Sequence, residues 1–532
     1  MTSPTGNGLR RALMSVSDTQ GLVELAGTLS QMGWEIWATD GTASHLEAAG
    51  VAVRRLAQLT GHGTLLGGRV KSLHPAVFAG VLARPDETDL TELERLGGVA
   101  FDWVVVNFYP FGDYVARLGD RPPDARELVE FIDIGGPALV RAAAKNHDRV
   151  AVVTDPSQYP ALLDELRRSP SGQLSPATRR RLAVAAFRLT AAYDALVATT
   201  LERIEAGEGS GARLPEVLHL VAERWRVARY GENPHQSGAI YRIPWSGPSV
   251  PWGNVLQGKE LSYNNVADAS AALELILELA DRPAACAIKH GSPCGAAVAD
   301  TLARAYERCY EADPVSIFGG VVALSRPVDA ATAQLMERTF LEVIVAPSFE
   351  PDALAILAKK PRLRLIEVGP MEGRGRAVGW PTWEVRSVPG GLLVQTPDEL
   401  DLVEEQLRTV TQTPVPDALW PDLRFAWRVV KHARSNAIVV ARDGQTLGIG
   451  AGQVNRIDAA RQALQRAGAR AAGAVLASDG FFPFSDVVEL AAEHGIAAII
   501  QPGGSMRDHE SVTAADRAGL PMVFTGVRHF RH

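Results

Sequence analysis

The sequence predicts an α/β protein, because short apolar runs alternate with amphipathic helical patterns along most of its 532 residues. Hydrophobic residues make up 46% of the chain and charged residues 22%, which are ordinary proportions for a globular protein with buried cores. A chain of this length holds roughly three or four domain-sized units. In residues 11–205 the alternation predicts a parallel sheet covered by helices on both faces.

The elements of this first part follow one another in a regular order. Strands are expected at residues 11–16, 35–38, 51–56, 103–108 and 150–154. Helical patterns are expected at residues 21–32, 46–49 and 176–205. Because strands and helices interleave, this part is expected to form a single domain, residues 1–206.

A Gly/Ser-rich run at residues 207–213 is the best linker candidate, and residues 214–532 are expected to form the second domain. A change of composition at residues 361–381 predicts a seam between two subdomains, with an Arg/Gly-rich loop there. Further on, Asp443 and Gly444 lie between two apolar runs and predict a β-hairpin. Each subdomain offers an apolar strand that runs into a Gly-containing turn, which leaves an internal duplication open.

Charge and cysteine content narrow the class of protein. The net charge of −7 argues against a broad nucleic-acid-binding surface. The three cysteines are too few and too badly spaced for a disulfide framework or a four-ligand zinc site. The first eight residues lack an apolar signal core, and no apolar run approaches the length of a membrane span. We expect a cytoplasmic protein with no nucleic-acid, membrane or metal partner.

Residues 289–295 read Lys-His-Gly-Ser-Pro-Cys-Gly and follow an apolar run that predicts a buried strand. Lys289 and His290 are therefore expected where a strand ends at a crevice. The Pro-Cys pair fits half of the zinc-deaminase signature, but Ala297 occupies the second ligand position and no His-x-Glu precedes. An ammonium beside an imidazole can transfer protons without a metal. A Lys paired with a carboxylate beside a buried His is the alternative.

Hydroxyl groups and cations gather at strand ends in the first part. Ser17 and Thr39 follow the first two strands, where helix N-termini could hold a phosphate, although plain N-capping is the commoner role of such residues. Arg69 and Lys71 alternate along an extended segment and so point the same way, as two cations that clamp an anion would. The same pattern is also typical of a solvated face.

A further cluster follows the most apolar strand. Tyr109 lies just after that strand, and Asp133 precedes Gly135 and Gly136, which open a helix that carries Lys145. Because these loops leave one edge of the sheet, they predict a pocket for an anionic ligand.

The order of these blocks, followed by Arg229 to Gln236 and then Lys289-His290, resembles the bifunctional AICAR transformylase/IMP cyclohydrolase family of purine biosynthesis. The resemblance runs over residues 13–532. It implies a methylglyoxal-synthase-like parallel-sheet domain that closes the purine ring, followed by a transformylase of two deaminase-like α/β subdomains without zinc. It also implies 10-formyltetrahydrofolate as formyl donor and a homodimer with transformylase sites across the interface, and it leaves a bound monovalent cation open.

The resemblance assigns roles to individual residues. It implies cyclohydrolase catalysis by Lys71, Tyr109, Asp133 and Lys145, and formyl transfer by Lys289 and His290. In these roles Asp133 would take the amide proton, the two lysines of the first domain would stabilise the oxyanion, and His290 would take the amine proton. Substrate binding is implied for Ser17, Thr39, Arg69, Ser72, Gly135, Gly136, Arg229, Tyr230, Asn265, Asn436, Arg456, Phe482, Arg528 and Phe530.

Three residues of the first domain depart from the family pattern. Thr19 replaces a usual Lys, Asp40 a usual Gly, and Phe78 a usual His. A lost cation and a gained carboxylate would weaken phosphate binding by roughly a few kcal/mol if both face the phosphate. Two alternatives therefore stay open, which are a transformylase with an impaired cyclohydrolase domain and a non-catalytic folate- or nucleotide-binding protein.

Overall fold

The fold is described from a computed structural model, which describes residues 9–118, 124–206, 214–373, 375–377 and 382–532. The chain divides into an N-terminal unit that ends at Val221 and a C-terminal unit that begins at Ala222. The linker predicted at residues 207–213 lies outside the described residues.

The N-terminal unit contains a five-stranded parallel sheet with the order β3-β2-β1-β4-β5. Its strands are β1 (Arg11–Ser15), β2 (Glu35–Ala38), β3 (Arg54–Arg55), β4 (Trp103–Val106) and β5 (Ala151–Val153). The predicted parallel sheet is confirmed, but its third strand keeps only two residues in the ladder, while Val51 and Val53 pack against the core from outside it. The strand order reverses between β1 and β4, which is where ligands bind in open α/β sheets.

Ten α-helices of the described residues accompany this sheet. They are α1 (Leu22–Gln31), α2 (Asp40–Ala48), α3 (Ala57–Thr60), α4 (Pro75–Leu82), α5 (Glu87–Arg95), α6 (Phe111–Leu118), α7 (Ala125–Glu130), α8 (Gly135–Lys145), α9 (Tyr159–Arg168) and α10 (Pro176–Ala206). Every residue of β4 is buried, as the apolar run predicts for a strand covered on both faces.

Helix α10 has the length and apolar composition of a membrane span. However, it packs along α8 and β5, and Leu182, Ala183 and Ala186 from its first half belong to the core of the unit. A core helix passes the same test of length and composition, and this packing accounts for the apolar character of α10.

The C-terminal unit contains a twelve-stranded sheet with the order β18-β23-β22-β21-β19-β20-β11-β10-β12-β13-β14-β9. Its first half has β9 (Asn254–Gln257), β10 (Ala284–Lys289), β11 (Ser292–Val298), β12 (Gly320–Leu324), β13 (Leu341–Ala346) and β14 (Arg364–Glu367). Its second half has β18 (Arg408–Thr409), β19 (Ile438–Arg442), β20 (Gln445–Gly450), β21 (Val475–Ser478), β22 (Ala498–Gln501) and β23 (Met522–Phe524). The hairpin predicted around Asp443 and Gly444 is confirmed as β19 and β20.

The two halves repeat one topology. The first half adds α11 (Tyr263–Glu278), α12 (Leu302–Ala312), α13 (Ala330–Glu337) and α14 (Pro351–Leu357), and the second adds α15 (Trp420–Lys431), α16 (Arg456–Ala467), α17 (Asp486–Glu493) and α18 (Asp508–Ala518). In both halves a helix and a β-hairpin precede three helix–strand pairs, and the sheet order outward from the seam is equivalent. The internal duplication that the sequence left open is therefore present, with β11 and β20 paired at the seam.

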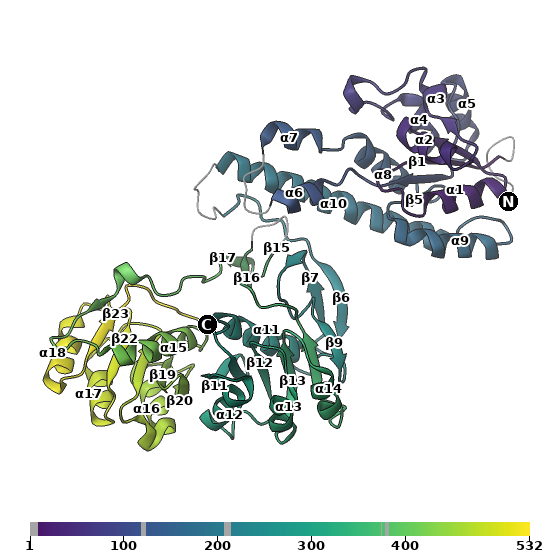
Figure 1. Cartoon of the computed structure of the whole chain (residues 1–532). Coiled ribbons are helices and arrows are strands. Elements are labelled where there is room, and N and C mark those ends of the chain that lie inside the picture. The colour runs from purple at the N-terminus through teal and green to yellow at the C-terminus, as the bar shows by residue number, and fades with distance from the viewer. Residues whose placement is uncertain (1–8, 119–123, 207–213, 374, 378–381) are drawn as a thin grey trace. The chain divides into compact units, whose positions relative to one another are not determined.

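Helices cover both faces of this sheet (Figure 1). Side chains of α11 and α15 share one hydrophobic core that runs across both halves. On the opposite face, α12, α13 and α14 pack on the first half, and α16, α17 and α18 pack on the second. The two halves therefore form one continuous layered unit.

Three short ladders lie outside the large sheet. They pair β6 (Glu223–Ala228) with β7 (Gly238–Arg242), β8 (Trp245–Ser246) with β15 (Arg376–Ala377), and β16 (Glu384–Val388) with β17 (Gly391–Gln395). The segment predicted to loop out after residue 361 in fact contains β14, in which Leu365 and Ile366 are buried. Their charged neighbours Arg364 and Glu367 mask this strand in the sequence.

Candidate active sites

The N-terminal cavity, of about 740 Å³, opens at the reversal of strand order between β1 and β4. It is lined by the carboxyl ends of both strands and by the N-termini of α2 and α8, whose amides favour anions. Nine residues predicted from the sequence line it together, namely Ser17, Thr39, Arg69, Lys71, Ser72, Tyr109, Asp133, Gly135 and Gly136. Lys145 is exposed at the far end of α8 and is not among the described residues that line the cavity.

Lys71 and Tyr109 approach each other at the wall of this cavity. The Lys71 ammonium donates a hydrogen bond to the Tyr109 hydroxyl and lies 5.0 Å from the centroid of its ring. Tyr109 is 40% exposed, so a ligand can reach this pair. The pair offers a cation and a phenol to a developing negative charge.

Asp133 is one of two carboxylates among the described residues that line the cavity, and the other, Glu130, forms an ion pair with Arg69. The Oδ1 of Asp133 accepts a hydrogen bond of 2.9 Å from the Gly136 amide. Burial raises the pKa of Asp133 above its usual value, although the amides of Gly136, Tyr109 and Gly135 and the charge of Lys71 oppose the shift. A carboxylate with a raised pKa is a stronger base than an exposed one.

Tyr193 of α10 connects the two loops that carry Tyr109 and Asp133. Its ring packs edge-on against Phe108 and Phe111, with centroids 5.1 and 5.9 Å away. Its hydroxyl accepts a 2.7 Å hydrogen bond from the Asp133 amide. Burial raises the pKa of Tyr193 to about 12, so the hydroxyl keeps its proton. Sequence reasoning did not identify this residue.

Replacement of Tyr193 by Phe keeps the ring and removes the acceptor of the Asp133 amide. We expect the rate of the ring closure that the family resemblance implies to fall about three- to tenfold, because a buried amide left unpaired costs roughly 1–3 kcal/mol unless its loop moves. Steady-state kinetics on the substrate that the resemblance implies for this step, the formylated AICAR nucleotide (FAICAR), measure the effect. Tyr114→Phe is the matched control, since Tyr114 is also buried and stacks on Phe131 of the same cluster. An equal loss in both variants would contradict the role of Tyr193.

Asp40 does not face the N-terminal cavity, although its neighbours Thr39 and Gly41 do. Its carboxylate accepts hydrogen bonds from the Thr64 hydroxyl at 2.8 Å and the Thr64 amide at 3.3 Å, and it lies 3.9 Å from Arg55. The expected repulsion of a bound phosphate is thereby reduced. Thr19 is likewise absent from the described lining residues, and Phe78 packs partly buried against the core.

Replacement of Asp40 by Gly restores the usual family residue. Asp40 accepts hydrogen bonds from Thr64 and does not line the cavity. We therefore expect the KM for FAICAR to stay within about twofold, or to rise because the variant loses a hydrogen bond to a charged acceptor. Thr64→Val is the matched control that removes the hydroxyl donor from the same contact. A KM lowered tenfold in the Gly variant would show that the carboxylate does repel the substrate.

The hairpin pocket, of about 300 Å³, lies in the C-terminal unit between its two halves. Lys289, His290 and Ser316 line it from the first half, and Arg434, Gln462 and Arg466 line it from the second. The Lys289 ammonium donates a 2.7 Å hydrogen bond to the Phe318 carbonyl. The described lining contains three cations, of which Arg466 forms an ion pair of 3.5 Å with Asp313, so the excess of positive charge favours an anionic or electron-rich ligand.

Asn436 and Arg456 lie in a network beside this pocket. Gly452 donates to the Arg434 carbonyl at 2.7 Å, and Asn436 donates from its side chain to the Gln453 carbonyl at 2.9 Å. Arg456 is 6% exposed, and its guanidinium donates to Asp479 and, at 2.7 Å, to the Asn436 side chain. Both predicted residues are thus near the pocket, but Arg456 is already neutralised by a carboxylate.

The C-terminal tail docks on the same network. Ser435 donates to the Arg531 carbonyl at 2.8 Å, and His529 donates from its backbone to the Asp479 carbonyl at 2.9 Å. Arg528 lies 4.6 Å from the ring centroid of Phe530, whose side chain is 41% exposed. The sequence alone is also compatible with a frayed end, which these bonds exclude.

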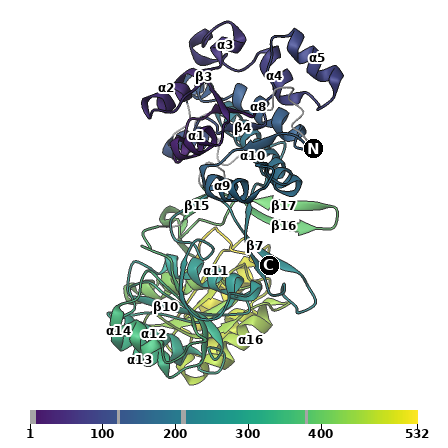
Figure 2. The same cartoon turned by 90° about the vertical axis from the view of Figure 1, so that its right-hand side faces the viewer.

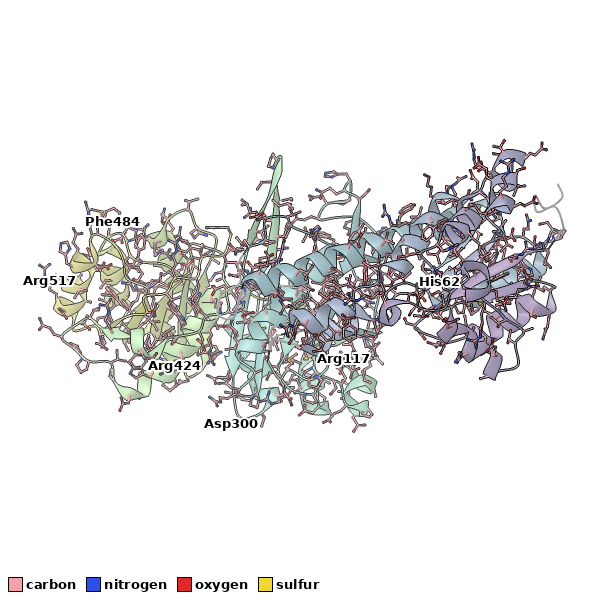
Figure 3. The ribbon with its side chains drawn as sticks, turned by 90° about the horizontal axis from the view of Figure 1, so that it is seen from above. His62, Arg117, Asp300, Arg424, Phe484 and Arg517 are labelled. Atoms are coloured by element: carbon pink, nitrogen blue, oxygen red, sulfur yellow. The ribbon has the colours of Figure 1, made fainter. Side chains whose placement is uncertain are left out.

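Phe482, for which the family resemblance implies substrate binding, does not offer an exposed ring. It is fully buried in the core of the second half, because the segment after β21 turns it under α17. The exposed aromatic ring of this segment belongs to Phe484, which is labelled in Figure 3 and is 52% exposed.

Arg229, Tyr230 and Asn265 are not among the described residues that line the hairpin pocket. Arg229 and Tyr230 lie just after β6, and the same loop is bound by the Asn264 side chain, which donates to the Glu232 carbonyl at 3.2 Å. Asn265 caps α11 in a reciprocal pair of hydrogen bonds with Ser262. One turn later on this helix, Asp268 accepts a 2.7 Å hydrogen bond from the Gly291 amide, beside His290.

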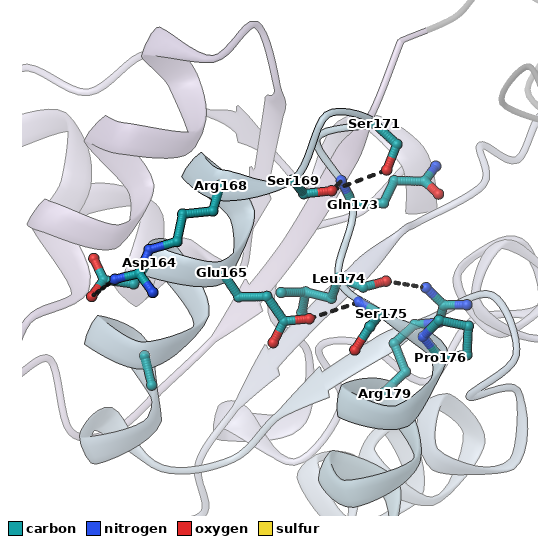
Figure 4. A pocket seen from close by; sticks show the side chains of 11 residues that line it. Asp164, Glu165, Arg168, Ser169, Ser171, Gln173, Leu174, Ser175, Pro176 and Arg179 are labelled. Carbon is teal, nitrogen blue, oxygen red and sulfur yellow. Dashed lines mark hydrogen bonds and ion pairs between the residues drawn. The ribbon is translucent and has the colours of Figure 1, made fainter.

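A third cavity lies at the junction of α9 and α10 (Figure 4). Its central polar groups bind the protein itself, since Glu165 accepts from Ser175 and Thr178 while Arg179 donates to the Leu174 carbonyl. Because the hydrogen-bonding capacity of these groups is used within the protein, we assign this cavity a structural role. None of its residues was predicted as a site residue from the sequence. In the described part of the chain, no group of three or more His, Cys, Asp or Glu side chains is arranged to hold a metal ion.

Comparisons with known proteins agree with this arrangement. An MGS-like domain matches residues 21–138, and the AICARFT/IMPCHase bienzyme family matches residues 143–466. A protein of Bacillus cereus (strain AH820), described as bifunctional purine biosynthesis protein PurH, is 46% identical over 98% of this chain and 100% of its own length. A protein of Deinococcus deserti with the same description is 49% identical with the same coverage. A solved chain titled "Crystal structure of ForH" is 37% identical, covers 37% of this chain and 98% of its own length, and has a TM-score of 0.31.

The family resemblance and the predicted fold class are confirmed by these matches. The methylglyoxal-synthase-like prediction agrees with the parallel sheet of the N-terminal unit, and the transformylase prediction agrees with the mixed sheet of the C-terminal unit. Both relatives match from end to end at nearly half identity, and both carry a bifunctional description. The chain therefore belongs to the AICARFT/IMPCHase bienzyme family and is a bifunctional AICAR transformylase and IMP cyclohydrolase of purine biosynthesis.

Proposed function

We propose that the N-terminal cavity closes the purine ring and that the hairpin pocket transfers the formyl group. In sequence, AICAR would accept a formyl group from 10-formyltetrahydrofolate to give FAICAR, and FAICAR would lose water to give IMP. The observation that supports the first assignment best is the convergence of nine predicted residues on one cavity. The second rests on Lys289 and His290 at a cationic pocket between two duplicated halves.

In the cyclohydrolase reaction, the amide nitrogen of FAICAR attacks its own formyl carbon. Asp133 would accept the amide proton, since its raised pKa makes it a base of adequate strength. Lys71, with Tyr109 beside it, would donate a hydrogen bond to the formyl oxygen as that atom becomes negative. The oxygen would then leave as water, with the amide proton that Asp133 had accepted and with the proton of the formamido nitrogen as the ring double bond forms. The exposed Lys145 has no part in this proposal. Positioning by Ser17, Thr39 and the two glycines of α8 would supply much of the acceleration, because the reaction is intramolecular.

In the formyl transfer, the exposed imidazole of His290 would accept the proton of the AICAR amine as it attacks the formyl carbon. Lys289 would stabilise the developing charge and deliver a proton toward the departing folate nitrogen. Arg434, Asn436 and Phe530 would bind the two substrates around this point. The cations of the pocket suit the nucleotide phosphate and the folate carboxylates, which are anionic.

We also propose a cytoplasmic homodimer formed through the C-terminal unit. The β16–β17 hairpin projects from that unit (Figure 2) and exposes Val385, Val388, Leu392 and Leu393. A two-stranded hairpin with exposed apolar side chains is marginal by itself and is typical of a protein interface. A second copy of the chain would cover it.

A product assay tests the proposed function. Purified protein is incubated with AICAR and 10-formyltetrahydrofolate, and the nucleotides are separated over time. We expect IMP, with little FAICAR accumulated. FAICAR that persists would contradict the assignment of the N-terminal cavity, and no formylated product at all would contradict that of the hairpin pocket.

A further inference from the structure

The duplication of the C-terminal unit produces two equivalent hairpin turns. The first, His290-Gly291, joins β10 to β11, and the second, Asp443-Gly444, joins β19 to β20. In both turns the first residue is left-handed, with φ of 54° at His290 and 54° at Asp443. Two such residues in a row form the turn that suits a two-residue hairpin.

A carboxylate on the preceding helix holds each turn. In the first half, Asp268 of α11 accepts a 2.7 Å hydrogen bond from the Gly291 amide. In the second half, Asp422 of α15 accepts one of 2.7 Å from the Gly444 amide. Since α11 and α15 are equivalent helices on the same face of the sheet, the duplication has kept the same contact twice.

The surroundings of the two turns differ. The second turn is held by more hydrogen bonds, because Asp422 also accepts one from the Asp443 amide at 2.8 Å and Arg308 donates to the Asp443 carbonyl at 2.6 Å. Asp422 is only 8% exposed. The first turn instead faces the hairpin pocket through His290. Among the described residues, Asp268 is the one whose side chain accepts a hydrogen bond from the Gly291 amide.

The residue types follow this difference. Asp tolerates the left-handed conformation well, so Asp443 suits a purely structural turn. His is also enriched among left-handed residues, but this conformation costs any residue other than glycine roughly 1–3 kcal/mol, and such residues cluster at functional sites where their surroundings hold them in place. His290 is therefore a strained residue whose position depends on the fastening of its turn.

We propose that Asp268 is a positioning residue for His290, a role that rests on the proposed function of the hairpin pocket. By holding the Gly291 amide, Asp268 keeps the imidazole aimed into the pocket, where the AICAR amine is to lose its proton. Asp422 accepts the equivalent hydrogen bond from Gly444, in a turn to which no catalytic role is assigned. It is therefore a matched control within the same chain.

The test compares Asp268→Ala with Asp422→Ala in the full-length protein, using the KM for AICAR and the kcat of FAICAR formation. We expect Asp268→Ala to lower kcat about tenfold with KM within about twofold, because a released turn lets His290 leave its strained conformation. Asp422→Ala should lower the melting temperature and leave kcat unchanged. Asp268→Asn, which keeps the acceptor oxygen, should restore most of the activity.

Each outcome decides the proposal. A kcat of Asp268→Ala equal to that of the wild type, or lowered no more than in Asp422→Ala, would overturn it. An Asn variant as impaired as the Ala variant would show that the charge acts instead of the hydrogen bond. If Asp268→Ala does not fold, Asp268→Glu displaces the same acceptor and should give the same loss. Wild-type protein without formyl transfer would count against the proposed function rather than against Asp268.

Discussion

Replacement of His290 by Ala is expected to lower the rate of formyl transfer from 10-formyltetrahydrofolate to AICAR by about 10²- to 10⁴-fold, the usual contribution of a general base. The amine of AICAR is a poor nucleophile, so its attack depends on removal of its proton. His290 is the imidazole that lines the hairpin pocket. Single-turnover formation of FAICAR measures this loss.

The N-terminal unit supplies an internal control for that experiment. Cyclohydrolase activity, assayed with FAICAR itself, should be unchanged in His290→Ala. The variant His290→Asn separates proton transfer from backbone conformation, because Asn also tolerates the left-handed conformation but is not a base. We expect it to be as inactive as the Ala variant. Substantial activity in the Asn variant would show that His290 serves the turn rather than the proton.

Much of the fold could be predicted because its strands are short, buried and apolar. The run at Trp103–Val106 is apolar at every position, as a strand covered on both faces requires. β11 was harder to predict, since Gly291 and Pro293 look like the end of a strand but form a turn and continue in the next strand of a hairpin. In β14 only two apolar residues lie between charged ones, too few for periodicity to detect.

The residues of the candidate sites also differ in whether they could be predicted from the sequence. Residues that belong to compact motifs, such as Lys71 and Asp133, could be identified because several chemically active groups stand together in the sequence. Tyr193 and Asp268 could not, since they lie 60 and 23 residues from the amides that they hold. Such pairs depend on how helices pack on the sheet, which local patterns do not encode. Asp40 is a residue whose effect the sequence overstated. Its carboxylate binds the Thr64 hydroxyl and does not line the cavity, so it repels a bound anion less than its position in the sequence suggests.

Asp133 combines catalysis with a cost in stability. Because burial raises its pKa in the folded protein, the folded state holds the proton of Asp133 more tightly than the unfolded state does. The protonated Asp133 therefore adds to the free energy of unfolding below its ordinary pKa, and this stabilisation is lost as the pH rises through the raised pKa. At neutral pH the ionised carboxylate destabilises the N-terminal unit, and the same ionisation makes it a base.

Replacement of Asp133 by Asn should consequently separate the two effects. We expect the cyclohydrolase rate to fall about 10²- to 10⁴-fold, while the melting temperature of the N-terminal unit at neutral pH rises, because Asn carries no charge and can still accept from Gly136. In the wild type the rate should rise with pH as Asp133 ionises. Kinetics on FAICAR and thermal unfolding over a range of pH measure these changes.

Asp102 provides the matched control for this prediction. Its pKa is also raised by burial, its carboxylate accepts a 2.9 Å hydrogen bond from the Arg11 amide, and it is not among the described residues that line the N-terminal cavity. Asp102→Asn should therefore leave the cyclohydrolase rate unchanged. If Asp133→Asn kept its activity, or lost it together with its stability, the carboxylate would be a structural group. A loss of activity with a gain of stability is the combination expected of a buried catalytic carboxylate.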